Sequence, residues 1–204
     1  MSRWFLLSLS LSLRRWFLRN NIMSAIPFLP PARPRLTLAL ALSRVAVPVN
    51  LGEVTVLGFR GYYHVDEDDN ERGKYDDAVA IVGPEHWSTY NFNADPSAHR
   101  KGIATLTAGD WRYKPGIHGL SKPKAHQYAA FVQAGPVQVR RDQGVTESGY
   151  FGINIHRGGN TGTSSLGCQT LPPAQWDAFR RTLLDQLRRA GQKSFRYILT
   201  DKPT

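Results

Sequence analysis

From Glu53 onward, short runs of alternating hydrophobic and polar residues recur along the chain, separated by Gly, Pro, Asp or Asn. Runs of this kind, rich in β-branched and aromatic residues, predict β-strands. The runs that fit the pattern cover residues 53–63, 78–83, 102–109, 128–135, 137–142, 150–156 and 195–200. Their number and spacing predict a mainly β fold, a mixed sandwich or a barrel-like sheet with largely antiparallel pairing.

One segment, residues 172–191, has a helical period instead. Pro172 and Pro173 suit a first helical turn, and Gly191 can end the helix. Large apolar residues recur in it at spacings of three and four: Trp176, Phe179, Leu183, Leu184 and Leu187. The sequence therefore predicts one C-terminal amphipathic helix whose apolar face packs on a sheet.

Residues 1–49 differ from the rest of the chain. They hold seven arginines and no acidic residue, so they carry most of the net charge of +10. The apolar runs at 4–13 and 36–42 are shorter than the roughly 18 residues that span a bilayer. Such runs beside arginines are typical of a secretion signal, of an anchor at a membrane surface, or of a wrongly assigned start, for which Met23 is an alternative. We expect this segment to be signal, anchor or disordered, and peripheral to a single folded domain at 50–204.

Composition narrows the classes of protein further. The 204 residues are 41% hydrophobic and include 18 Gly and 13 Pro, which favours one turn-rich core. A single cysteine excludes an internal disulfide and multi-cysteine zinc patterns, so no metal or other cofactor is expected. No nucleic-acid-reading motif accompanies the basic charge, so no nucleic acid partner is expected. The acidic stretch 64–77 lacks the glycine of a calcium loop and predicts a solvated hairpin tip.

His156 and Cys168 flank a loop of mostly Gly, Ser, Thr and Asn. A thiol becomes a nucleophile when a neighbouring base takes its proton or stabilises the thiolate, and histidine can do both. His156 ends the predicted strand 150–156, and the loop allows Cys168 to return to it. Gly167 permits close backbone approach, so the N–H groups of Gly167 and Cys168 are candidate oxyanion donors. The alternative is a buried structural cysteine with an unrelated histidine.

The stretch IHRGG…SSLGCQTL resembles the L,D-transpeptidase catalytic motif, a histidine followed by a Gly-rich loop and Ser/Thr-His-Gly-Cys. His156, Ser165, Gly167 and Cys168 fall in register with that motif. The resemblance implies a β-rich catalytic domain in which Cys168 is acylated and His156 is its base. Three departures stand out: Leu166 occupies the place of the second histidine, the loop is shorter, and Gln169 replaces an Arg or Asn that helps to hold substrate.

The function implied by the resemblance is acyl transfer on peptidoglycan stem peptides in the cell envelope, periplasmic or secreted. The N-terminal segment is compatible with membrane association. Two alternatives remain. One is a hydrolytic L,D-carboxypeptidase or endopeptidase, encoded by a phage or acting as an effector. The other is a wall-binding or virion-associated domain without catalysis.

Further residues are candidates for substrate contacts. Residues 111–128 contain His118, His126 and four basic residues, which suit either a grip on substrate carboxylates or a plain surface hairpin loop. Tyr113 and His118 are expected nearest the site. Arg157 can pair with a substrate carboxylate. Asn154 shares a strand face with His156 and can orient its imidazole, as can a backbone carbonyl. By their place in the motif, Ser165 and Gln169 complete the candidate substrate-binding residues.

Overall fold

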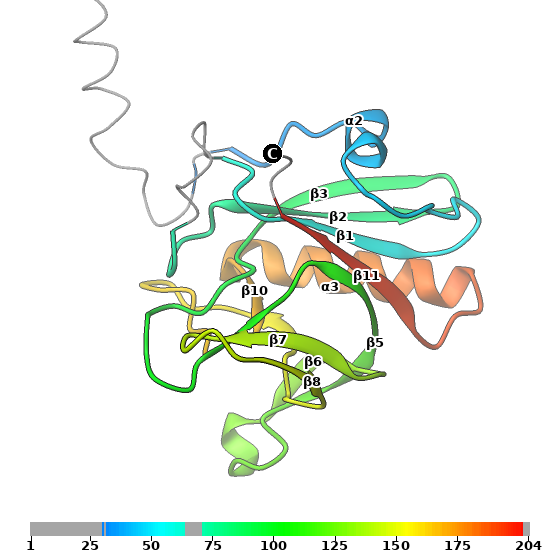
Figure 1. Ribbon diagram of the computed structural model, residues 1–204. Coiled ribbons are helices and arrows are strands. Elements are labelled where there is room, and N and C mark those ends of the chain that lie inside the picture. Colours follow the sequence, from blue (N-terminus) through cyan, green and yellow to red (C-terminus); the bar gives the residue numbers. More distant parts are fainter. Residues whose placement is uncertain (1–29, 31, 64–70, 202–204) are drawn as a thin grey trace, which may run out of the picture.

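Eight strands of the computed structural model form one mixed sheet (Figure 1). The structure describes residues 30, 32–63 and 71–201. In spatial order the strands are β10 (Gln169–Leu171), β9 (Ile155–Arg157), β6 (Tyr128–Gln133), β5 (Gly109–His118), β11 (Phe195–Thr200), β1 (Thr55–Phe59), β2 (Asp77–Gly83) and β3 (His86–Phe92). Most neighbours are antiparallel, but β1–β11 and β9–β10 are parallel pairs. The predicted mainly β class is confirmed.

The two edges of this sheet nearly meet, which makes it barrel-like. Asn93, just after β3, exchanges backbone hydrogen bonds of 2.9 and 2.8 Å with Thr170 in β10. A second sheet of three strands, β4 (Ala104–Leu106), β7 (Val137–Arg141) and β8 (Thr146–Gly149), adds apolar side chains to the same core. The closure matters for function because it brings β9 and β10 against the rest of the barrel.

The long helix α3 (Pro173–Arg189) and residues 36–49 lie on opposite faces of the strands β1–β3 (Figure 1). The helix buries Trp176, Phe179, Leu183 and Leu187, four of the five apolar residues that predicted it; Leu184 packs partly buried against the same cluster. Its position directly after β10 fixes the end of the segment that carries Cys168.

Part of the N-terminal segment belongs to the fold, contrary to the expectation that it is peripheral. The short helix α2 (Leu38–Ser43) begins after Thr37, whose Oγ1 accepts a hydrogen bond from Leu40 N. Leu36 and Ala41 are buried against β1 and β2. The apolar run at 36–42 therefore covers a sheet face, since its side chains protect Leu57, Ala78 and Ala80 from water. The other apolar run, at 4–13, lies outside the described residues.

Several elements differ from the predicted ones. Strands β3, β5, β8 and β10 were not predicted, and only the end of the predicted strand 150–156 is a strand. Strand β5 takes up residues 111–118 of the expected loop 111–128, and the 3-10 turn η1 (Lys124–His126) lies near the tip of the β5–β6 hairpin. Asp76 and Asp77 were expected in a solvated loop, but both are buried. Burial of the Asp77 carboxylate is compensated by hydrogen bonds that it accepts from Gly61 N and Ala94 N.

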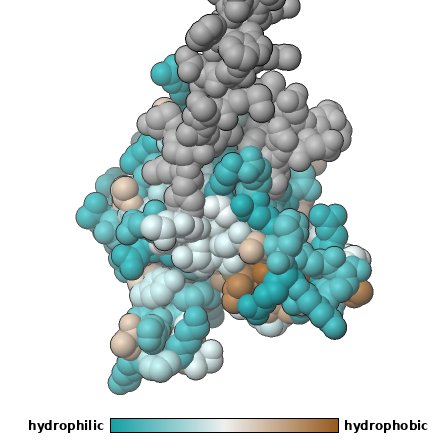
Figure 2. Space-filling model, turned by 90° about the vertical axis from the view of Figure 1, so that its left-hand side faces the viewer, coloured by the Kyte–Doolittle hydropathy of each residue, from teal (hydrophilic) through white to brown (hydrophobic). Residues whose placement is uncertain are grey.

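One face of the molecule shows no large apolar patch among the described residues (Figure 2). The face in Figure 2 is mostly hydrophilic, with apolar residues confined to small patches. In the described part of the chain, no helix combines the length and apolar character that crossing a membrane requires.

Candidate active site

His156 and Cys168, which the sequence predicts to form a pair, lie beside each other at two adjacent parallel strands. His156 lies in β9, and Cys168 immediately precedes β10, where Gln169 pairs with Ile155 and Thr170 with His156. The intervening loop is fixed by Ser165, whose backbone N–H donates to Ser97 Oγ and whose hydroxyl donates to the Cys168 carbonyl. The spacing of eleven residues between His156 and Cys168 is thus enough to return the chain to the same sheet edge.

The ring of His156 is held in one tautomer. Its Nδ1 lies 2.7 Å from the Arg157 carbonyl oxygen and 3.0 Å from the Tyr128 hydroxyl. Because a carbonyl only accepts, Nδ1 carries the proton and Nε2 keeps a free lone pair. The ring is buried. His156 is therefore oriented by a backbone carbonyl, one of the two arrangements expected from the sequence, and Nε2 can act as a base.

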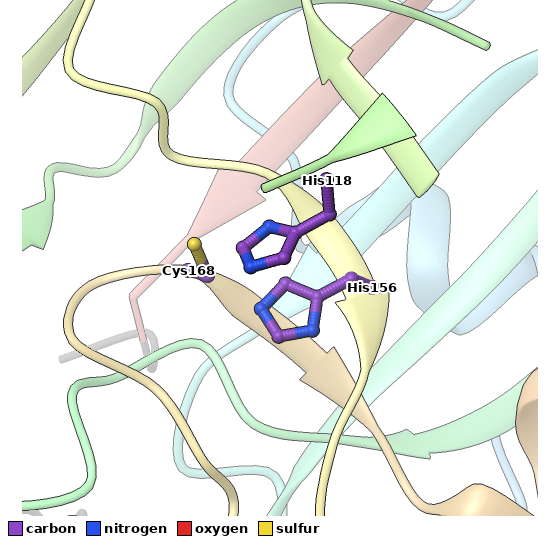
Figure 3. Close-up of side chains that lie close together, drawn as sticks. All are labelled: His118, His156 and Cys168. Carbon is purple, nitrogen blue, oxygen red and sulfur yellow. The ribbon is translucent and has the colours of Figure 1, made fainter. Parts of the chain in front are cut away.

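A second histidine joins the pair. His118, at the end of β5, lies against His156 with ring centroids 4.2 Å apart and the ring planes tilted by 35°, and both rings point toward the Cys168 sulfur (Figure 3). The sequence offered Asn154 as a residue that orients His156. Asn154 instead makes a hydrogen bond of 3.0 Å to His118 Nδ1 and therefore orients His118. Leu166, where the resembled motif has its second histidine, is 65% exposed. The second histidine thus reaches the thiol from a different strand.

The thiol of Cys168 is partly buried and hydrogen-bonded on two sides. Asn154 N–H donates to Sγ, and Sγ donates to the Gly152 carbonyl, both at 3.4 Å. The sulfur and one ring nitrogen of each histidine lie within 4.8 Å of one another.

Burial determines the protonation states of His118, His156 and Cys168. Burial, the neighbouring His118 and Lys122 lower the pKa of His156 to about 4, although the Arg157 carbonyl opposes this. Burial also raises the pKa of the Cys168 thiol to about 11, against the Asn154 N–H and Lys122, which lower it. Burial and Lys122 lower the pKa of His118. At neutral pH the free protein therefore holds a neutral thiol beside neutral imidazoles, not a thiolate–imidazolium pair.

The oxyanion donors differ from those expected. The Gly167 N–H donates to Ser165 Oγ at 3.0 Å and is therefore occupied. Among the described residues, the Cys168 N–H has no hydrogen-bond partner. It is the donor available to a carbonyl oxygen that is attacked by its own sulfur. The role of Gly167 is conformational: its φ of +132° and its contact with the Ala104 carbonyl leave no room for a side chain.

Three predicted site residues support the site without lining it. Tyr113 is buried, and its hydroxyl donates to the Ile153 carbonyl, which holds residues 152–154 behind the thiol. Gln169 is buried and bonds to the Ala94 and Gly167 carbonyls and to the Tyr197 hydroxyl, so it cannot meet a substrate. Ser165 is buried in the loop. Arg157, in contrast, is exposed beside His156.

An open groove of about 810 Å³ reaches the site from one side. The β5–β6 hairpin and residues 150–154 form its walls, and His118, Gly152 and Asn154 form the end nearest the thiol. Lys114 and Lys122 line it, and Tyr150 stands 69% exposed at its edge. Lys114 and Lys122 are two of the four basic residues in 111–128 that the sequence offered either as a grip on substrate or as part of a plain surface loop. The sequence gave no signal for Tyr128, Tyr150 or Gly152, whose roles depend on strand pairing.

Comparison with known proteins gave no significant match to a family, to a curated protein or to a solved structure. The function of the protein is therefore inferred from the geometry of the site and from the motif in the sequence.

Proposed function

We propose that the protein is a cysteine acyltransferase of the L,D-transpeptidase type that acts on peptidoglycan stem peptides. The observation that carries the proposal is the convergence of three groups. These are the Cys168 thiol, the unprotonated Nε2 of His156, and the unpartnered Cys168 N–H. A nucleophile, a base and an oxyanion donor are the parts that acyl transfer requires. The substrate class comes from the resemblance of the motif.

The proposed first half-reaction begins from the neutral pair. The substrate carbonyl oxygen binds at the Cys168 N–H, and the thiol turns from Gly152 toward His156. His156 Nε2 takes the thiol proton as Sγ forms a bond to the carbonyl carbon. The tetrahedral intermediate collapses, the C–N bond breaks, and the new imidazolium gives its proton to the leaving amine of D-alanine. The products are a thioester on Cys168 and free D-alanine.

In the second half-reaction an acceptor attacks the thioester. His156 Nε2 takes a proton from the attacking amine or water, the C–S bond breaks, and the thiolate recovers that proton. An amine acceptor gives a cross-link, and water gives hydrolysis. His118 lies against the His156 ring, and its positive charge, when it is protonated, lowers the pKa of His156 and so keeps the resting imidazole of His156 unprotonated.

The groove suits a peptide that carries carboxylates. Lys114 and Lys122 supply positive charge along it, and Tyr150 supplies an exposed aromatic surface. Arg157 offers a further cation on the other side of His156. Stem peptides carry several carboxylates, so the charge of the groove is complementary to them.

Muropeptides provide the test. Wild-type protein, Cys168→Ala and His156→Ala are each incubated with purified muropeptides, and the products are identified by mass spectrometry. We expect new cross-links with release of D-alanine for wild type and none for either variant. His126→Ala, which changes an exposed histidine on the same hairpin, serves as the matched control and should retain activity.

The products separate the alternatives. Loss of D-alanine or of existing cross-links, without new ones, would replace transfer by hydrolysis. Absence of every product in wild type, with retained binding to sacculi, would favour a wall-binding domain and refute the proposed chemistry.

A further inference from the structure

Three possible metal ligands converge at one point, although no spacing in the sequence suggested a metal site. His118, His156 and Cys168 each present one ligand atom, and these atoms lie within 4.8 Å of one another (Figure 3). We propose that this cluster binds a divalent transition-metal ion of the zinc class. The donor set, two imidazoles and one thiolate, suits a borderline-soft ion and not Mg²⁺ or Ca²⁺.

The ligands are already oriented by hydrogen bonds of the kind found around metal sites. A histidine ligand usually donates its second ring N–H to a carbonyl, and His156 Nδ1 does so to Arg157 at 2.7 Å. Asn154 holds His118 Nδ1 at 3.0 Å, and its amide can present either oxygen or nitrogen to that ring. Both Nε2 atoms are therefore free to bind metal. The Asn154 N–H, which donates to Sγ, favours a bound thiolate.

The cluster needs only a small contraction to coordinate an ion. Tetrahedral geometry at usual Zn–N and Zn–S distances places ligand atoms about 3.4–3.6 Å apart. The atoms therefore approach one another by at most about 1.4 Å from their present limit of 4.8 Å. His118 is only partly buried at the end of β5, so it is the ligand best able to move. The groove supplies the direction from which water or substrate completes the fourth position.

Metal binding would consume the groups on which acyl transfer depends. The Cys168 proton leaves to solvent, the thiolate bonds to the ion, and the lone pair of His156 Nε2 is occupied. The ion thus acts as a reversible block on the site. This inhibitory consequence rests on the proposed function, but the binding of the metal does not. Lys122, which lies close enough to influence both groups, opposes a bound cation.

Cobalt gives a direct readout. Full-length protein treated with EDTA is titrated with Co²⁺ in the visible and near ultraviolet. We expect a thiolate-to-cobalt charge-transfer band, d–d bands of tetrahedral intensity, saturation at one equivalent, and displacement by Zn²⁺. Cys168→Ser should abolish the charge-transfer band, and His118→Ala should weaken affinity at least about tenfold. Lys122→Ala should tighten binding, and His126→Ala should leave it unchanged.

Two results would overturn the inference. One is a folded wild-type protein, checked by circular dichroism, that shows no charge-transfer band. The other is equal Co²⁺ affinity in wild type and in folded His118→Ala. The muropeptide assay separates this inference from the proposed function. Cobalt spectra as expected, with no product from the metal-free enzyme, would leave the metal site standing and refute the function. Product without a cobalt band would support the proposed function and refute the metal site.

Discussion

The reactivity of Cys168 in the free protein is the sharpest test of the site's electrostatics. The pKa of the thiol is about 11 and that of His156 about 4. At pH 7 the thiolate fraction is then about 10⁻⁴, against a few per cent for an ordinary thiol of pKa ~8.5, a ratio of roughly 300. A more basic thiolate is also more nucleophilic, by about 10–18-fold for this difference. The net expectation is a reaction about 25-fold slower than that of an unhindered cysteine.

A thiolate–imidazolium pair does not change this expectation. The gap of about seven between the two pKa values makes proton transfer from thiol to imidazole unfavourable by on the order of 10 kcal/mol. Attraction between the two charges at roughly 5 Å returns only about 3 kcal/mol at an effective dielectric constant of about 20. The ion pair is therefore no more populated than the free thiolate at pH 7, and substrate must assist the transfer of the proton.

The assay is thiol–disulfide exchange with a small aromatic disulfide in EDTA, followed by absorbance across pH. Cys168 is the only cysteine in the chain, so the signal has one source, and the same chain unfolded in guanidinium is the internal reference. The folded protein should react about 25-fold more slowly at pH 7, the rate should rise up to high pH, and His156→Ala should change it little. Rapid exchange at pH 6–7 that His156→Ala abolishes would refute the reasoning.

Three further predictions concern stability, measured by chemical denaturation. Gly167→Ala should lower the free energy of unfolding by about 2–4 kcal/mol, because the new side chain meets a backbone carbonyl at a position of positive φ. Gly144→Ala, also at positive φ but in open space, should lower it by only about 1 kcal/mol. Equal losses in the two variants would contradict the clash. Phe179→Ala, at a fully buried helix position, should cost about 3–5 kcal/mol, and a loss below 1 would contradict the packing. The hydrogen bonds from Arg72 lower the pKa of Asp142, so its stabilisation is present above the ordinary value of 3.8 and is lost as pH falls through the lower folded value. Asp142→Asn should therefore be destabilised at pH 6 and approach wild type near pH 2, and a difference independent of pH would argue against this.

Local sequence patterns predicted those helices and strands in which the buried positions follow the regular spacing of the element itself. The helix α3 follows from its apolar spacing, and β2 from a run of residues that is buried on both faces. Strand β5 was missed because Lys114, Pro115 and Gly116 do not read as a strand. Pro115 is tolerated because β11 pairs only with residues 109–113, so that part of β5 has one neighbour fewer.

The sequence by itself predicted the pairing of His156 with Cys168, because the two residues flank one short loop. Only the tertiary structure decided what surrounds them. His118 lies 38 positions before His156, and Tyr128 lies on another strand, so no local spacing could reveal that both reach the same imidazole. Burial, which moves the two pKa values apart, is likewise a property of the packed barrel and not of the motif. Chemistry carried by neighbours in sequence can be predicted from residue types, but chemistry assembled across a sheet depends on register and packing.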